Sequence, residues 1–145
     1  MSASRPAANP GPRVGLLVVG HGSRRAAANE VLVAVAAEVA GRSTGLQAVS
    51  HAFLEIARPT IAEGYAELVA AGCEHVVVHP YFLYPGNHTT TDIPGALAVA
   101  QAAAPAVGWT MSEPLGVDPR IVDVVLERVA GALPVPSAAA DGGTQ

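Results

Sequence analysis

The 145-residue chain contains no lysine: its eight basic residues are all arginines, and twelve acidic residues give a net charge of −4. Binding to nucleic acid requires a broad basic surface, and an anionic membrane attracts runs of basic residues, so we expect neither partner. Cysteine is almost absent. Cys73 alone cannot form an internal disulfide, and residues 1–12 lack the apolar stretch of a signal peptide. These features favour a cytoplasmic location.

Charged residues and long apolar runs are both scarce. Only 14% of the residues are charged and 50% are apolar, a balance typical of a globular protein. Proline, glycine or a charged residue interrupts every apolar run well before the roughly 18 residues that a membrane-spanning helix needs. No phosphate-binding motif such as GxxxxGKS is present, so we expect no nucleotide cofactor. The length suits one domain with one core.

Strand and helix patterns alternate along the chain. Residues 1–12 and 134–145 are rich in Ala, Pro, Gly and Ser and are predicted to be disordered tails around a folded domain at 13–133. The predicted strands are 14–19, 46–53, 75–83 and 108–112, and the predicted helices are 26–40, 59–71, 92–104 and 119–133. This alternation predicts a single flavodoxin-like α/β domain: a four-stranded parallel sheet, strand order 2-1-3-4, with helices on both faces.

Local signals mark the predicted helix ends. Gly41 and Gly72 are expected to end the first two helices, Pro59 to lie in the first turn of the second, and Thr91 or Asp92 to cap the third.

Two histidines follow strands that this order makes neighbours. His21 lies in Gly20-His21-Gly22-Ser23-Arg24 after the first strand, and His88 follows Pro85-Gly86-Asn87 after the third. In open parallel sheets ligands bind beyond the carboxyl ends of the strands where the order reverses. The pair therefore predicts metal or proton chemistry in one crevice, although a tight turn with an incidental histidine would also explain His21.

Three further features surround this predicted crevice. Glu55 stands among apolar residues after the second strand, where a partly desolvated carboxylate would exchange protons near neutrality. Ser23 is expected to cap the following helix, whose amino end favours an anion. The loop after the third strand offers hydroxyl and backbone N–H groups to carboxylates or phosphates, from Asn87, Thr89, Thr90 and Thr91. Arginines flank the crevice and either are solvated or bind ligand carboxylates.

Three segments resemble those of the short sirohydrochlorin chelatases, a class of tetrapyrrole chelatases that insert cobalt or ferrous iron into sirohydrochlorin. These are Gly20–Arg24, Ala52–Glu55 and above all Phe82–Pro94. The resemblance implies that His21, His88 and Glu55 are catalytic and bind the divalent metal substrate, Co²⁺ or Fe²⁺. It also implies that sirohydrochlorin, which carries eight carboxylates, is the substrate. We expect it to be bound by Ser23, Arg24, Asn87, Thr89, Thr90 and Thr91, with Phe82, Leu83 and Tyr84 against the face of the macrocycle. The histidine-rich stretch of some short members is missing.

Two other functions compete with the chelatase interpretation. A non-enzymatic metal or tetrapyrrole carrier is the stronger; a hydrolase is weaker, because Ser23 is not in a GxSxG motif. His51, His75, His79 and Cys73 are interpreted as structural. A homodimer is expected, because residues 93–108 contain no charge and the last helix carries apolar residues around much of its circumference.

Overall fold

The computed structural model describes residues 11–136, and for His88 and Thr90 it describes the backbone only. The predicted tails at 1–12 and 134–145 therefore lie largely outside the described residues. Within them, four strands form one parallel sheet in the order β2-β1-β3-β4, which confirms the predicted topology. The strands are β1 (Val14–Gly20), β2 (Ala48–Phe53), β3 (His75–Pro80) and β4 (Gly108–Met111). In this part of the chain no helix is long and apolar enough to cross a bilayer.

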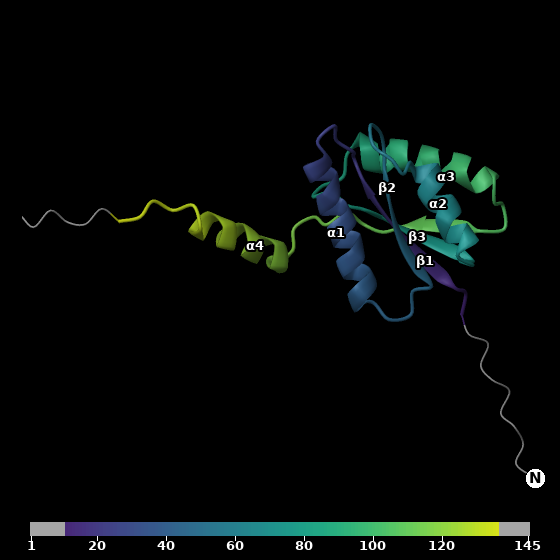
Figure 1. Cartoon of the computed structure of the whole chain (residues 1–145), viewed down its shortest axis with the longest axis horizontal. Helices are drawn as coiled ribbons and strands as arrows, with labels where there is room; N and C mark the ends of the chain where they lie inside the picture. The colour runs from purple at the N-terminus through teal and green to yellow at the C-terminus, as the bar shows by residue number, and fades with distance from the viewer. Residues whose placement is uncertain (1–10, 137–145) are drawn as a thin grey trace, which may run out of the picture.

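Helices cover both faces of the sheet (Figure 1). Helix α1 (Ala26–Arg42) packs on one face, where Leu32 and Ala36 join Val18 and Phe53 in a small core. Helices α2 (Ile61–Ala70) and α3 (Ile93–Ala102) pack on the other face. Because side chains alternate along a strand, the neighbours Val18 and Val19 belong to these two different cores.

The larger core lies between the sheet and the helices α2 and α3. Leu17, Val76 and Leu97 are among its fully buried members. Tyr65 is also buried there, and its hydroxyl donates a 2.6 Å hydrogen bond to the Val107 carbonyl oxygen just before β4. This bond satisfies the polar end of an otherwise apolar side chain, as a buried tyrosine requires.

Two helix ends differ from the prediction. Helix α1 continues through Gly41 to Arg42, where the Ser43 N–H still bonds the Val39 carbonyl oxygen at 2.8 Å. A glycine inside a helix costs only about 1 kcal/mol of helix stability, which is too little for one glycine to end the helix. Pro59 does not lie in the first turn of α2, because Thr60 is the N-cap and forms a reciprocal capping box with Glu63.

The segment after β3 also differs from the prediction. Strand β3 ends at Pro80 instead of Leu83, since the Phe82 N–H turns back to the Pro80 carbonyl oxygen at 2.9 Å. What was predicted as loop contains a one-turn π-helix at His88–Asp92, which leads directly into α3. Asp92 stands at the N-cap position of α3 without a side-chain capping bond.

Helix α4 (Pro119–Ala130) projects away from the sheet domain and has no buried residue (Figure 1). It ends three residues earlier than predicted, and the description of it as apolar around much of its circumference was wrong. At helical spacing, its charged residues fall on one side and most of its apolar residues on the other. The charged residues are Arg120, Asp123, Glu127 and Arg128. The helix is amphipathic, and its apolar side is uncovered.

Candidate metal and proton-transfer site

The loop after β1 and the loop after β2 are hydrogen-bonded to each other beyond the ends of their strands. The Leu54 N–H donates to the Gly20 carbonyl oxygen at 2.9 Å, and the Glu55 N–H donates to the His21 carbonyl oxygen at 3.0 Å. The parallel register of β1 and β2, which pairs Gly20 with Phe53, thus continues by two more residues. This continuation places Glu55 beside His21, as the prediction of a shared crevice requires.

His21 and Glu55 form an ion pair at the rim of the sheet. The Nε2 atom of His21 lies 2.9 Å from Oε1 of Glu55, and both side chains are accessible, at 41% and 55% exposure. On the other side of the ring, Nδ1 lies 3.1 Å from the carbonyl oxygen of Gly22. A carbonyl oxygen only accepts, so Nδ1 carries a proton and donates it. The other ring nitrogen, Nε2, shares a proton with the Glu55 carboxylate and is the nitrogen available to bind a metal ion.

The half-exposed Glu55 corrects one expectation. Its apolar sequence neighbours suggested a partly desolvated carboxylate, but Leu54 and Ile56 do not enclose it, and Ile56 is itself 59% exposed. Ile56 also adopts a positive φ of 72°. The Ala57 N–H donates to the Glu55 carbonyl oxygen at 2.8 Å across Ile56, so the backbone turns sharply directly after Glu55. Access to it, and not burial, is what the fold provides.

Gly22 makes this close approach of the two loops possible. Its φ of +101° lies in the region that glycine adopts readily, and a Cβ at this position would overlap with the carbonyl oxygen of Glu55. The glycines on both sides of His21 are visible in the sequence, but this contact is not. The partner residue is 33 positions away, so only the folded chain reveals it.

Asn29 is a site residue that the sequence analysis missed. Its Oδ1 accepts the Ser23 N–H at 2.9 Å, and its Nδ2 donates to the Ser23 carbonyl oxygen at 2.8 Å. The backbone N–H and the carbonyl oxygen of Ser23 are therefore both fixed by one side-chain amide in the first turn of α1. Ser23 does not cap this helix: Arg25 is the N-cap residue, and Ser23 Oγ accepts the Arg25 N–H at 3.0 Å. An amide six residues after a serine was the only available signal.

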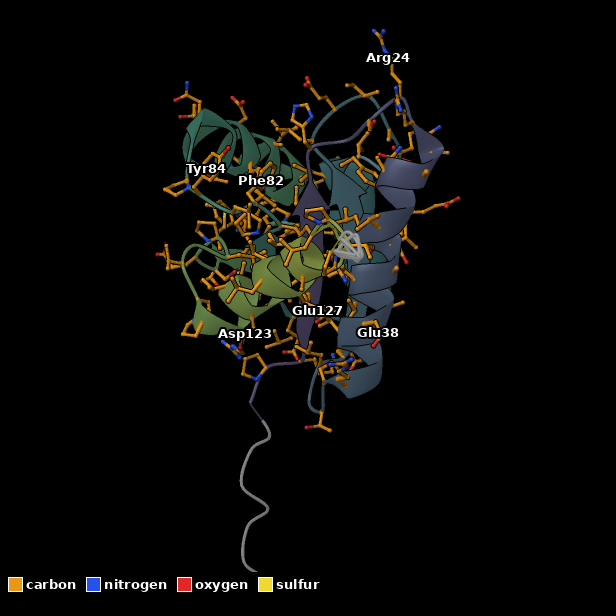
Figure 2. All side chains as sticks on the ribbon, turned by 90° about the vertical axis from the view of Figure 1, so that its left-hand side faces the viewer. Arg24, Glu38, Phe82, Tyr84, Asp123 and Glu127 are labelled. Atoms are coloured by element: carbon orange, nitrogen blue, oxygen red, sulfur yellow. The ribbon has the colours of Figure 1, made fainter. Side chains whose placement is uncertain are left out.

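A hollow of about 230 Å³ adjoins the ion pair. It is lined by the loop after β1, by the first turns of α1 with Asn29, and by the aromatic side chains of Phe53 and Tyr81. Pockets that enclose a drug-sized ligand usually measure about 300–1,000 Å³, so this hollow is small for a macrocycle. Arg24 is exposed and points away from the ribbon at this rim (Figure 2), where it can meet a ligand from outside.

The exit of β3 lies next to the exit of β1, as predicted. The Tyr81 N–H bonds the Val19 carbonyl oxygen at 2.8 Å and extends the β1–β3 pairing. His88 begins the π-helical turn that follows, but its side chain lies outside the described residues, as does that of Thr90. Asn87 and Thr91 are exposed. Among the described side chains, no group of three metal-binding residues gathers.

Two predicted substrate-binding residues have other roles in the structure. Thr89 is 3% exposed, and its hydroxyl both accepts from the Gly86 N–H and donates to the Gly86 carbonyl oxygen, each at 2.9 Å. It fastens the loop from inside and is not open to a carboxylate. Phe82 packs partly against the core on the α2–α3 side, whereas Leu83 is 54% exposed, as contact with a macrocycle requires.

Two of the remaining histidines form hydrogen bonds within the fold, and the cysteine is buried. Nε2 of His75 lies 3.0 Å from Thr110 Oγ1, and Nδ1 of His79 lies 2.7 Å from Ser112 Oγ, so both tie β3 to the chain at β4. Burial lowers the pKa of His79. Cys73 is buried, and burial raises the pKa of its thiol, which fits the predicted structural role.

Comparison with known proteins supports the predicted resemblance. The sequence profile of the CbiX family matches residues 15–132. A chloroplastic sirohydrochlorin ferrochelatase of Arabidopsis thaliana is 35% identical over 119 residues, which cover 82% of this chain and 52% of that protein. A sirohydrochlorin cobaltochelatase of Methanothermobacter thermautotrophicus is 34% identical over 140 residues, covering 86% of this chain and 96% of that protein.

A solved structure has the same fold. The sirohydrochlorin chelatase SirB of Bacillus subtilis subspecies spizizenii, crystallised in complex with cobalt, superposes with a TM-score of 0.77 at 29% identity. The match covers 82% of this chain and 50% of that one. The chain thus spans about half the length of the plant and Bacillus relatives and nearly all of the archaeal one. With its sheet order, its rim of histidine and glutamate and these matches, the chain belongs to the CbiX family of sirohydrochlorin chelatases.

Proposed function

We propose that this protein inserts Co²⁺ or Fe²⁺ into sirohydrochlorin without a nucleotide, for cobalamin or siroheme biosynthesis. The observation that carries the proposal is the accessible pair of His21 Nε2 and Glu55 Oε1, 2.9 Å apart on the rim shared by β1, β2 and β3. Imidazole suits both metals, and a carboxylate beside it adds an oxygen ligand. The named relatives catalyse insertion of one or the other metal, and the donor set does not choose between them.

Metal insertion exchanges one divalent ion for two pyrrole protons. Because Nδ1 of His21 is held protonated by the Gly22 carbonyl oxygen, only Nε2 is able to bind the ion, and the proton that Nε2 shares with Glu55 passes to solvent water when the ion binds. When the ion passes to the macrocycle, Nε2 and Oε1 are again open to accept a proton. One pyrrole proton returns to this pair, and we assign the second to His88. Loose binding by few ligands keeps the transfer possible.

Carboxylates of the substrate are proposed to meet Ser23 and Arg24 after β1, the exposed Asn87 and Thr91 after β3, and Thr90 of the same loop. Arg58, another arginine near the rim, is already bound in a two-pronged contact to Glu63, at 3.0 and 2.7 Å. It is therefore a weaker candidate than Arg24 for a substrate carboxylate. Leu83 is proposed to lie against the macrocycle.

The proposal includes a homodimer that works in the cytoplasm, where a lone thiol such as Cys73 stays reduced. The hollow of about 230 Å³ is too small to enclose sirohydrochlorin, and the plant and Bacillus relatives are about twice as long as the matched region. A second copy would complete the enclosure. Neither nucleic acid nor a membrane is part of the proposed reaction.

The test is anaerobic metal insertion, followed by the absorption change of sirohydrochlorin with Co²⁺ and with Fe²⁺ in separate assays. We expect a rate at least tenfold above the uncatalysed one with one of the metals, without ATP. A carrier would bind metal or macrocycle and leave the rate unchanged, and that result would overturn the proposal.

A further inference from the structure

Helix α4 presents an apolar face that no part of its own described chain buries. Val122, Val125, Leu126 and Val129 on this face are 45–60% exposed. The helix is well formed, since Asp118 caps it by accepting the Arg120 N–H at 2.9 Å. An amphipathic helix with an exposed apolar face is typical of a helix that packs against another element.

The start of α4 is held in a position from which the helix points away from its own sheet. The Leu115 N–H donates to the Phe82 carbonyl oxygen at 2.9 Å, and the Gly116 N–H donates to the Leu83 carbonyl oxygen at 2.6 Å. These bonds pin the connection after β4 to the segment after β3, two residues before the N-cap. From this fixed connection α4 extends outward, away from the sheet domain (Figure 1).

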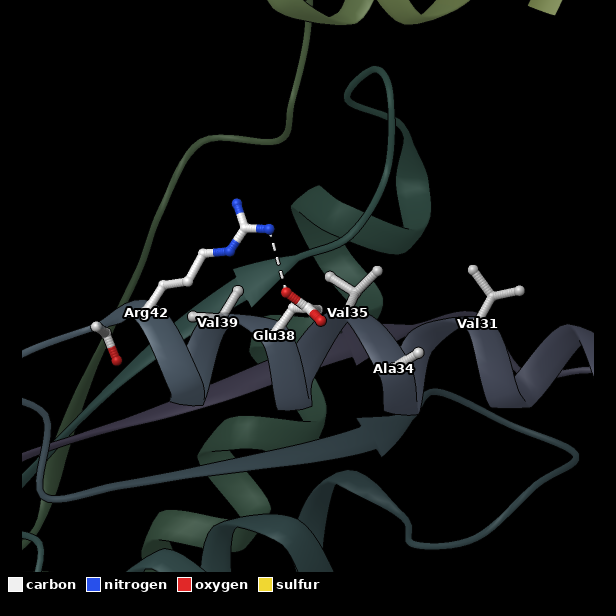
Figure 3. A pocket seen from close by; sticks show the side chains of 7 residues that line it. Val31, Ala34, Val35, Glu38, Val39 and Arg42 are labelled. Atoms are coloured by element: carbon white, nitrogen blue, oxygen red, sulfur yellow. Dashed lines mark ion pairs between the residues drawn. The ribbon is translucent and has the colours of Figure 1, made fainter.

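The same chain carries an apolar groove along α1 that is open to solvent. The groove measures about 630 Å³, and Val31, Val35 and Val39 line it on one side of the helix (Figure 3). The ion pair of Arg42 with Glu38, 3.1 Å long, stands at its edge. The groove runs from Val31 to Ser43. That is about 18 Å of helix, and the twelve residues of α4 are also about 18 Å long.

Next to this groove, part of the sheet lacks a covering helix. Along β3, Val76 and Val78 are buried under α2 and α3, while the alternate residues His75, Val77 and His79 on the α1 side are only half-buried. Helix α1 packs on β1 and β2, on the same face. In a doubly wound sheet a helix that follows the last strand can cover this part of the sheet. Here α4 points away from it (Figure 1).

We propose that α4 of one copy packs, apolar face inward, along α1 and β3 of a second copy, and that the exchange is reciprocal. The inference rests on the proposed homodimer and names the surfaces that form it. A second copy is the occupant that the chain itself supplies: it brings a helix of matching length and a matching empty place, and both contacts form at once in a symmetric pair. Charges do not oppose it, since Arg120 and Arg128 balance Asp123 and Glu127 on α4.

The first experiment compares two adjacent substitutions in the full chain. Val125→Asp places a charge on the apolar face of α4, whereas Val124→Asp places the same charge between Arg120 and Arg128 on the polar side. By sedimentation at micromolar concentration the wild type and V124D are expected at 29.2 kDa, twice 14.6 kDa, and V125D at 14.6 kDa. A V125D chain that stays paired would overturn the proposal.

A second experiment detects the contact between copies directly and does not depend on V125D folding. Chains carrying Val125→Cys are mixed with chains carrying Val35→Cys, and after oxidation we expect a disulfide-linked heterodimer. Val33→Cys, on the opposite flank of α1, is the matched control and should not cross-link to Val125→Cys. Cys73 is buried and does not compete. Equal cross-linking of both α1 variants, or of neither, would contradict the exchange.

Metal insertion measured on the same samples separates this inference from the proposed function. A wild-type chain that pairs and cross-links through α4 but inserts no metal would refute the function and leave the exchange standing. Efficient insertion by a chain that pairs without α4 would refute the exchange and leave the function standing.

Discussion

The α-carbon of Gly22 lies against the carbonyl oxygen of Glu55, closely enough that residue 22 has no room for a side chain. This contact sets the distance between the loops that carry His21 and Glu55. The ion pair at the rim therefore depends on the absence of a Cβ atom at position 22.

Gly22→Ala is expected to reduce metal insertion by about 100-fold, because the loops must separate and a small misplacement at a reacting centre has effects of that size. Gly45→Ala is the matched control, since Gly45 has a similar φ of +92° but open space around it. It should cost only the backbone strain, about 1–2 kcal/mol in urea unfolding, with normal activity. Equal activity losses in both variants would show that strain alone, and not the contact, matters.

His21→Ala and Glu55→Gln are each expected to lower kcat by about 100-fold or more, with little change in KM, since general acid–base groups contribute on that scale. Both side chains are exposed, so thermal unfolding should stay close to that of the wild type. His88→Ala is predicted to behave in the same way. A change in KM alone for Glu55→Gln would reassign Glu55 to substrate binding.

Asn29→Ala removes the two hydrogen bonds that hold the backbone N–H and the carbonyl oxygen of Ser23. We expect destabilisation of about 1–3 kcal/mol by chemical denaturation and a clear loss of kcat, because the loop that carries His21 becomes loose. Gln47→Ala is the control: this amide bonds the Ala71 carbonyl oxygen at 3.2 Å at the amino ends of β1 and β2, opposite the rim, and should leave kcat unchanged. Normal kcat in Asn29→Ala would mean that the loop is held without this amide.

Ser23→Ala removes one acceptor, that of the Arg25 N–H, and is expected to cost about 1 kcal/mol or less while most activity remains. Complete loss of activity with intact binding of metal and substrate would indicate a nucleophilic serine and favour the hydrolase interpretation.

Acid is predicted to weaken α2 through Glu63. The hydrogen bonds from Arg58, then the Thr60 backbone, lower the pKa of Glu63 from 4.5 to about 2. A carboxylate with a lowered pKa in the folded state stabilises that state above pH 4.5, and this contribution fades as the pH falls towards 2. The stability difference between wild type and Glu63→Gln should therefore be largest near neutrality and vanish near pH 2 in urea titrations. A difference that stays constant with pH would contradict this.

The sequence by itself determined the strands, their order and the place of His21. Apolar runs such as Val14–Val19 are local, and the alternation with helices leaves few ways to wind a parallel sheet. It also brought His21 and Glu55 together, because both follow strands that this order makes neighbours. Local turn signals were less reliable: Gly41 did not end α1, and Pro59 preceded the N-cap, since hydrogen bonds around each residue outweighed its intrinsic preference.

Only the tertiary structure decided what depends on contacts between distant residues. The overlap that Gly22 avoids, the exposure of Glu55 and the core contact of Phe82 each involve partners that periodicity does not reveal. Even within a short loop the sequence did not reveal the role of Thr89. Its hydroxyl was expected to bind substrate, but it forms hydrogen bonds with the Gly86 backbone inside the loop. The place at which the chain leaves the domain towards α4 is fixed by two backbone bonds between the connection after β4 and the segment after β3, about thirty residues apart. Such bonds form only after the sheet has brought the two strand exits side by side.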